Sequence, residues 1–205
     1  MIVKDSGGGQ FEPAPAGTHV ARCIRLLDLG TQKSEFGAKR QVLVTWELPQ
    51  ELISSGELEG QPFTVSAYYT MSLNEKANLR HALEAWRGRA FTVEELKGFD
   101  LKAILGAPCL LSIVHNDNGR AKVSAVMALA KGTKAPKQIN ESVYLSLDPH
   151  EFDRATFDGL NDYWKEKIQL SPEWAALKQA KAAGATVGGD DPGPDGGWDD
   201  DQIPF

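Results

Sequence analysis

The sequence predicts a mainly β protein with added helices, built as three strands, a helical connection and a β-hairpin. Three stretches rich in β-branched and aromatic residues come first, two stretches with helix-start signals follow, and two further strand-like stretches flank a turn sequence. The chain has 205 residues, enough for one sizeable core and an appendage. The expected architecture is therefore one β-rich domain with a smaller extension.

Three strands are expected before the first helix. Residues 19–29 form the first and end at Gly30, residues 40–49 form the second and end at Pro49, and residues 63–70 form the third. Alternation in the second strand predicts a half-buried strand whose core face holds Val42, Val44, Trp46 and Leu48. The core face of the third strand is expected to hold Phe63, Val65, Ala67 and Tyr69.

Two helices are expected between the third and fourth strands. Ser72 and Glu75 have the spacing of a capping box, and Gly88 has the position of a C-terminal stop. A second capping box, Thr92 to Glu95, predicts another short helix. Helical spacing places three apolar residues of the first helix in the core: Leu79, Leu83 and Trp86.

A hairpin completes the predicted domain. Residues 109–115 and 120–129 read as strands, and residues 116–119 have the composition of a tight turn. In the second of these strands we expect Arg120, Lys122 and Ser124 on one face and Val123, Ala125, Met127 and Leu129 on the other. The element order is that of the OB-fold, a five-stranded, partly open Greek-key barrel that binds oligonucleotides. The sequence therefore predicts an OB-fold domain over residues 17–137.

Three segments flank this domain. Residues 1–16 contain three consecutive glycines and are expected to form a loose arm. Residues 138–182 are expected to form a helical extension with helix starts at Asp148 and Ser171. Residues 183–205 are rich in glycine and aspartate and are expected to be a disordered acidic tail. The apolar face of the extension, expected to pack on the barrel, consists of Phe152, Phe157, Leu160, Trp164 and Ile168.

Charge is divided unevenly along the chain. The formal net charge is −6, and six aspartates within residues 190–201 account for all of it, so residues 1–189 are neutral. Residues 17–137 contain 16 Lys and Arg against 12 Asp and Glu, a surplus of four positive charges. A mildly basic body with a concentrated acidic tail is typical of a protein whose tail binds partners.

The last eight residues read Trp-Asp-Asp-Asp-Gln-Ile-Pro-Phe. This end resembles the C-terminal tip of bacterial single-stranded DNA-binding proteins, although here Gln202 separates the aspartates from the isoleucine. The long insertion between the third and fourth strands and the helical extension look more like single-stranded DNA-binding proteins of tailed bacteriophages. The resemblance implies a protein that coats single-stranded DNA in replication, recombination and repair, and it assigns docking of replication, recombination and repair proteins to Asp199, Asp200, Asp201, Ile203, Pro204 and Phe205.

Binding of single strands requires cations for phosphates and aromatic faces for bases. Tyr68 falls on the polar face of the third strand, where an exposed ring suits stacking. The cations that can line one groove in the predicted fold lie in the first, second and fifth strands and in the segment after them. The complete set of candidate DNA-contacting residues is Arg22, Lys39, Arg40, Tyr68, Arg120, Lys122, Lys131, Lys134 and Lys137.

Other functions have less support in the sequence. It contains no phosphate-binding loop, dinucleotide fingerprint or paired Cys-x-x-Cys, so we expect no enzyme activity, no catalytic residues and no cofactor. A zinc site built from His19, Cys23, Cys109 and His115 is the weakest alternative, and reduced buried thiols are expected instead. A recombination nuclease or annealing factor, and a mimic of the host tail that does not touch DNA, are further alternatives. The N-terminus has no apolar signal core, so we expect a cytoplasmic protein that is not bound to a membrane.

Overall fold

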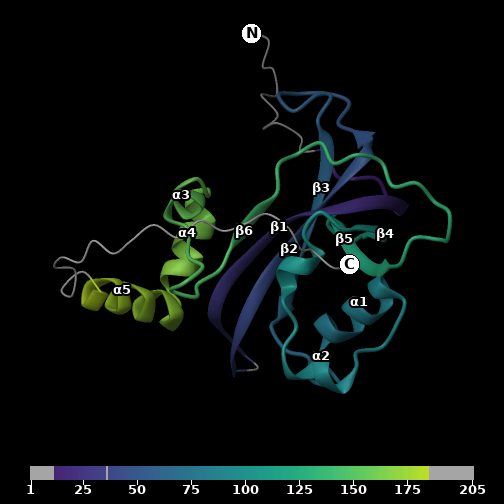
Figure 1. Cartoon of the computed structure of the whole chain (residues 1–205). Coiled ribbons are helices and arrows are strands. Elements are labelled where there is room, and N and C mark those ends of the chain that lie inside the picture. The colour runs from purple at the N-terminus through teal and green to yellow at the C-terminus, as the bar shows by residue number, and fades with distance from the viewer. Residues whose placement is uncertain (1–11, 36, 185–205) are drawn as a thin grey trace, which may run out of the picture.

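A computed structural model describes residues 12–35 and 37–184, and its centre is a six-stranded sheet (Figure 1). The strands are β1 (Gly17–Ser34), β2 (Gly37–Leu52), β3 (Pro62–Thr70), β4 (Pro108–His115), β5 (Ala121–Met127) and β6 (Val143–Leu145). Five of them form the path β3-β2-β1-β4-β5 with antiparallel neighbours, and β6 pairs in parallel with β1. Within the described residues β3 and β5 end this path without pairing to each other, so the sheet is open.

Strand β1 is central to the sheet because it is long enough to pair with three other strands. Its first residues pair with β4, and the rest pairs with β2 and, over three residues, with β6. Bulges between Cys23 and Arg25 and between Asp28 and Gly30 interrupt the β2 ladder, and bulges increase the local bend and twist of a strand. The five predicted strands are confirmed, whereas the sequence did not reveal β6.

Helices lie on two sides of the sheet (Figure 1). The connection between β3 and β4 contains α1 (Asn78–Arg87), α2 (Val93–Lys97) and a 3-10 turn, η1 (Leu101–Ile104). The extension contains α3 (Arg154–Asp158), α4 (Asp162–Gln169) and α5 (Pro172–Gly184). The segment between β5 and β6 arches over the sheet from one side to the other.

Helix starts are predicted correctly in two places and wrongly in two. Thr92 and Glu95 form the expected reciprocal capping box, and the Ser171 hydroxyl accepts a hydrogen bond from the Trp174 amide at the start of α5. Helix α1 instead starts after Ala77 without a side-chain cap, because the Ser72 hydroxyl accepts from the Asn74 amide in a preceding turn. Asp148 likewise begins a turn, and α3 starts six residues later.

Two hydrophobic clusters cover the two faces of the sheet. The first lies on the inner face with α1 and contains the expected core residues of β2, β3 and α1, including Trp46 and Trp86, whose ring centroids are 5.9 Å apart. The second joins Leu27, Leu29 and Leu43 to the extension, whose apolar residues Phe157, Leu160 and Ile168 are buried as expected. The extension therefore packs against the outer face of β1 and β2.

This second cluster corrects the prediction for β2. In the predicted half-buried strand, Leu43, Thr45 and Glu47 fall on the face opposite the core, but all three residues are buried. The extension covers Leu43, and the segment before β6 covers Glu47. Pro49 does not end the strand either, since β2 continues through an irregularity to Leu52.

Alternation in β5 also differs from the prediction. A bulge opposite Ser112 and Ile113 inserts one extra residue, which reverses the inside and outside positions beyond it. Val126 is consequently buried, whereas Met127 is 36% exposed and the expected core face of the strand is wrong there.

The ends of the predicted segments need a smaller correction. Residues 12–16 of the expected loose arm are held in place, since Ala14 is buried and its carbonyl accepts a hydrogen bond from the His115 ring. Residues 183 and 184, assigned to the tail, belong to α5. The rest of the arm and tail, including the six predicted partner-binding residues, lies outside the described residues. No helix in the described part of the chain is long and apolar enough to cross a bilayer.

The buried carboxylate of Glu47 provides a direct test of how the segment before β6 is held. It accepts hydrogen bonds from the Ile139 amide at 2.7 Å and from the Asn140 amide and side chain at 2.8 Å each. Glu47→Gln places an amide group opposite these donors, so we expect the free energy of unfolding to fall by about 2 kcal/mol. Urea denaturation measures this change. Glu57→Gln, at an exposed position, is the control and should change it by less than about 0.5 kcal/mol; equal effects would contradict the anchoring role.

Candidate nucleic-acid interface

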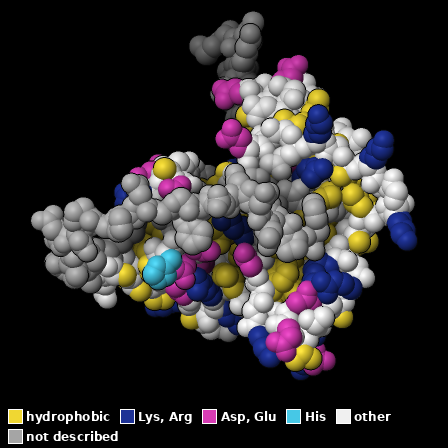
Figure 2. Space-filling model, viewed as in Figure 1, with side chains coloured by type: hydrophobic (Ala, Val, Ile, Leu, Met, Phe, Trp, Pro, Cys, Tyr) yellow, Lys and Arg dark blue, Asp and Glu magenta, His cyan; other side chains and the backbone are white. Residues whose placement is uncertain are grey.

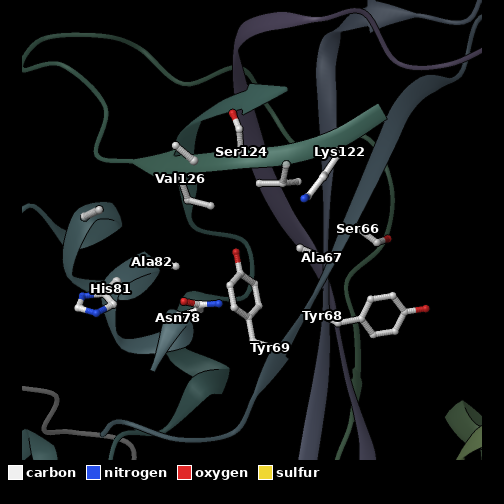
Figure 3. Close-up of a pocket in the computed structure, with 13 residues that line it drawn as sticks. Ser66, Ala67, Tyr68, Tyr69, Asn78, His81, Ala82, Lys122, Ser124 and Val126 are labelled. Atoms are coloured by element: carbon white, nitrogen blue, oxygen red, sulfur yellow. The ribbon is translucent and has the colours of Figure 1, made fainter. Parts of the chain in front are cut away.

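A groove lies where the sheet is open, between β3, α1 and β5 (Figure 3). Its volume is about 670 Å³, and an adjoining hollow of about 550 Å³ continues it toward the β4–β5 turn. Both hollows are bordered by Ser66 of β3, so we treat them as one feature, the β3–β5 groove. Its side chains that carry polar or aromatic groups are Thr64, Ser66, Tyr68, Tyr69, Asn78, His81, Asn118, Arg120, Lys122 and Ser124.

The two strands that border the groove are the outer strands of the sheet path. An outer strand presents amide and carbonyl groups that no neighbouring strand pairs with. Helix α1 closes one end by burying Leu83 and Trp86 in the first cluster, while Asn78 and His81 on its other side border the groove. The groove is therefore lined by hydrogen-bonding backbone as well as by polar side chains.

Two of the predicted cations belong to this groove. Lys122 is exposed on β5, and its amino group points toward Ala67 and Tyr69 of β3 (Figure 3). Arg120 is exposed just before β5 and borders the adjoining hollow. The expected grouping of these cations around one groove thus has a counterpart in the structure, and both can contact the backbone of a bound polyanion.

Aromatic rings meet the groove from β3. The ring of Tyr69 points into it between α1 and β5, whereas the ring of Tyr68 points away from it (Figure 3). Burial raises the pKa of Tyr69 to about 12, so its hydroxyl is protonated at neutral pH and adds no negative charge. Tyr69 was expected to be a core residue only. The structure shows that it both packs against the first cluster and lines the groove.

Sequence reasoning missed Asn78 and His81 as groove residues. They lie three residues apart on the side of α1 away from Leu79 and Leu83, which is the ordinary solvent side of an amphipathic helix. The helical spacing alone reveals this side, but only the packing of α1 across the sheet opening shows that it borders the groove.

Arg22 and Arg40, two further candidates, have protein partners elsewhere. Arg22 donates to the carbonyl oxygens of Pro136 and Gly106 at 2.6 and 2.7 Å. Arg40 forms an ion pair with the buried Asp28, and this hydrogen bond raises the pKa of the guanidinium. Neither side chain borders the groove, and their predicted contact with DNA stays a prediction.

The remaining candidate cations lie on exposed segments. Lys39 is exposed near the start of β2, and Lys131, Lys134 and Lys137 are exposed in the segment between β5 and β6. Figure 2 shows Lys and Arg side chains projecting on the side of the molecule where this segment loops outward. These lysines do not border the groove, so the structure does not gather all predicted cations into one site.

The two cysteines are separate buried thiols. Burial raises the pKa of Cys23 to about 12 and raises that of Cys109 as well, so both are protonated at neutral pH. The His19 ring contacts the Glu51 carboxylate and the Pro15 carbonyl, at 3.0 Å each. Among the described residues no group of three or more His, Cys, Asp or Glu side chains is arranged to hold a metal ion.

Comparison with known proteins adds no family assignment. No protein-family model matches the chain, and no curated protein shows significant similarity to it.

Proposed function

We propose that this protein binds single-stranded DNA along the β3–β5 groove and recruits replication, recombination and repair proteins through its C-terminal tip. The observation that carries the proposal is the groove itself, in which Lys122 and Arg120 stand opposite the aromatic and hydroxyl side chains of β3. Cations beside aromatic rings are the combination that binds single strands without reading their sequence.

The sheet order supports the same proposal. The path β3-β2-β1-β4-β5 brings its two end strands to opposite sides of one groove, as expected for a five-stranded OB barrel with an open seam. We propose that the DNA occupies this seam, where unpaired strand edges add hydrogen-bonding groups to the cations.

The proposed role of the tail rests on its sequence. A terminal phenylalanine can fill a small apolar pocket of a partner while its carboxylate meets a basic residue, and the aspartates favour a positive rim. The acidic tail and the basic body also suggest that the tail competes with DNA when DNA is scarce.

Fluorescence anisotropy tests the proposal with labelled oligo(dT) and a matched duplex, across a salt series, for the full chain and for residues 1–189. We expect tighter binding to oligo(dT) than to duplex. The logarithm of the binding constant should fall with the logarithm of the salt concentration with a slope of about −1.4 or steeper, the value for two phosphate contacts on a single strand. The shorter form should bind as tightly or more tightly. Absence of binding by both forms would refute the DNA-binding function and leave only the docking of partners by the tail.

A further inference from the structure

Three aromatic rings gather beside the groove, where the extension meets β3. Trp164 of α4 packs edge-on against Tyr163 with ring centroids 4.8 Å apart, and it is tilted against Tyr68 with centroids 5.9 Å apart. The inner ring, Trp164, is partly buried on the second cluster. The outer rings remain accessible, since Tyr163 is 59% and Tyr68 47% exposed. Two large aromatic side chains are therefore held in place while keeping much of their surface in water.

The rings are positioned by rigid parts of the molecule. Ile168 of α4 is fully buried in the second cluster, and the Gln32 side chain of β1 donates to the Lys167 carbonyl at 3.1 Å. Helix α4 is thereby attached to the sheet at its C-terminal half. A surface prepared in this way binds a ligand without a further loss of side-chain freedom.

Cations accompany the aromatic cluster. The Lys167 amino group lies 4.7 Å from the centre of the Tyr68 ring, and Lys165 lies on the same helix. Two acidic residues of α4 balance the formal charge of these two lysines: Asp162, which is 3.8 Å from Lys165, and the exposed Glu166. Burial and a hydrogen bond with Tyr163 raise the pKa of Tyr68 to about 12, so its hydroxyl adds no negative charge at neutral pH.

Lys39 adds a positive charge on this side of the sheet. It pairs in register with Gln32, the residue that holds the Lys167 carbonyl. Lys39 does not border the groove. It lies instead beside the end of β1 to which α4 is attached.

We infer that α4 carries a second single-stranded DNA subsite, in which a base stacks on Tyr163 and Lys167 contacts the phosphate backbone. Tyr68 links this subsite to the first, because its backbone position borders the β3–β5 groove while its ring packs on Trp164. This continuity with the groove, together with exposed rings flanked by lysines, favours a nucleic-acid strand over a protein partner. The inference rests on the proposed function and assigns the extension a direct part in it.

Oligonucleotides of two lengths test the inference on the full chain. An oligo(dT) of about 6 nucleotides fills the groove alone, and one of about 16 nucleotides also reaches α4, within the range of site sizes seen for OB domains. We expect Tyr163→Ala to weaken binding of the longer strand about 5-fold or more and to leave the shorter one unchanged. Tyr163→Phe retains the ring and should bind both strands like the natural chain.

Leu170→Ala is the matched control, because it removes another exposed apolar side chain next to the same helix. It should leave both affinities unchanged. If the natural chain binds neither strand, the proposed function fails. If the natural chain binds both but Tyr163→Ala has no effect, weakens both strands equally or is matched by Leu170→Ala, the groove remains and the second subsite is overturned.

Discussion

The double variant Lys122→Glu with Arg120→Glu reverses the charge of both groove cations. It should weaken binding of a long oligo(dT) about 100-fold at about 50 mM salt, because two attractions to phosphate groups become repulsions. In the same variant the plot of log binding constant against log salt concentration should become shallower by about 1.4, since each phosphate contact on a single strand contributes about 0.7 to the steepness. Both side chains are exposed, so the fold should be preserved. Anisotropy titrations at several salt concentrations measure both quantities, and thermal unfolding checks the fold.

The control for this experiment carries the same change in charge away from the groove. Lys97→Glu with Lys102→Glu alters two exposed lysines of α2 and η1 that do not border either hollow. It should weaken binding only a few-fold through the long-range field, and less at higher salt. An equal loss in the two double variants would mean that overall charge, and not the groove, determines affinity.

Gly30→Ala should lower the free energy of unfolding by about 3 kcal/mol. This cost is the sum of backbone strain, because a residue other than glycine disfavours the left-handed conformation, and of overpacking by the added methyl group. Gly30 has φ +66° at the second bulge of β1, and an added Cβ would lie 2.4 Å from the Cβ of Ser171. Ser171 caps α5, and Glu173 of α5 accepts hydrogen bonds from the Thr31 amide and hydroxyl at 2.7 and 2.6 Å. The methyl group therefore cannot be accommodated unless α5 moves away from β1.

Gly60→Ala separates these two effects. Gly60 has a similar φ of +79°, but no atom lies within 4 Å of its added Cβ. Its cost should be limited to backbone strain of about 1 kcal/mol. Urea denaturation of both variants gives the difference that belongs to the contact with Ser171. Equal costs would show that α5 is not packed against the bulge as described.

Local sequence patterns predicted the elements whose formation depends on neighbouring residues. The core face of β2 around Trp46, the turn at residues 116–119 and the capping box at Thr92 all depend on short-range spacing, and each is confirmed. Short β6 had no such pattern, since a three-residue strand forms only where β1 offers a free edge.

The candidate site depended on information of a different kind. Lys122 and Arg120 were recognised as exposed cations, and the structure places both at the groove. Tyr68 was recognised as an exposed ring, but this ring points away from the groove and packs on Trp164. Tyr69 and His81 were missed because their groove-facing position follows from where α1 crosses the open sheet. Arg22 and Arg40 look equally suitable in the sequence, and only long-range partners distinguish them from the groove cations.

The sequence by itself determined the chain order of the first five strands and the helices between them, the amphipathic face of α1, the division between a basic body and an acidic tail, and the Ile-Pro-Phe end. Each of these features depends on residues that are close together in the chain. The tertiary structure alone decided that the sheet stays open between β3 and β5, that the extension buries the outer face of β2, and that three rings meet beside the groove. The physical reason is that these features join segments far apart in the chain, as in the contact of Thr31 with Glu173, which are 142 residues apart. Such contacts are set by packing and hydrogen bonding between surfaces that no local pattern encodes.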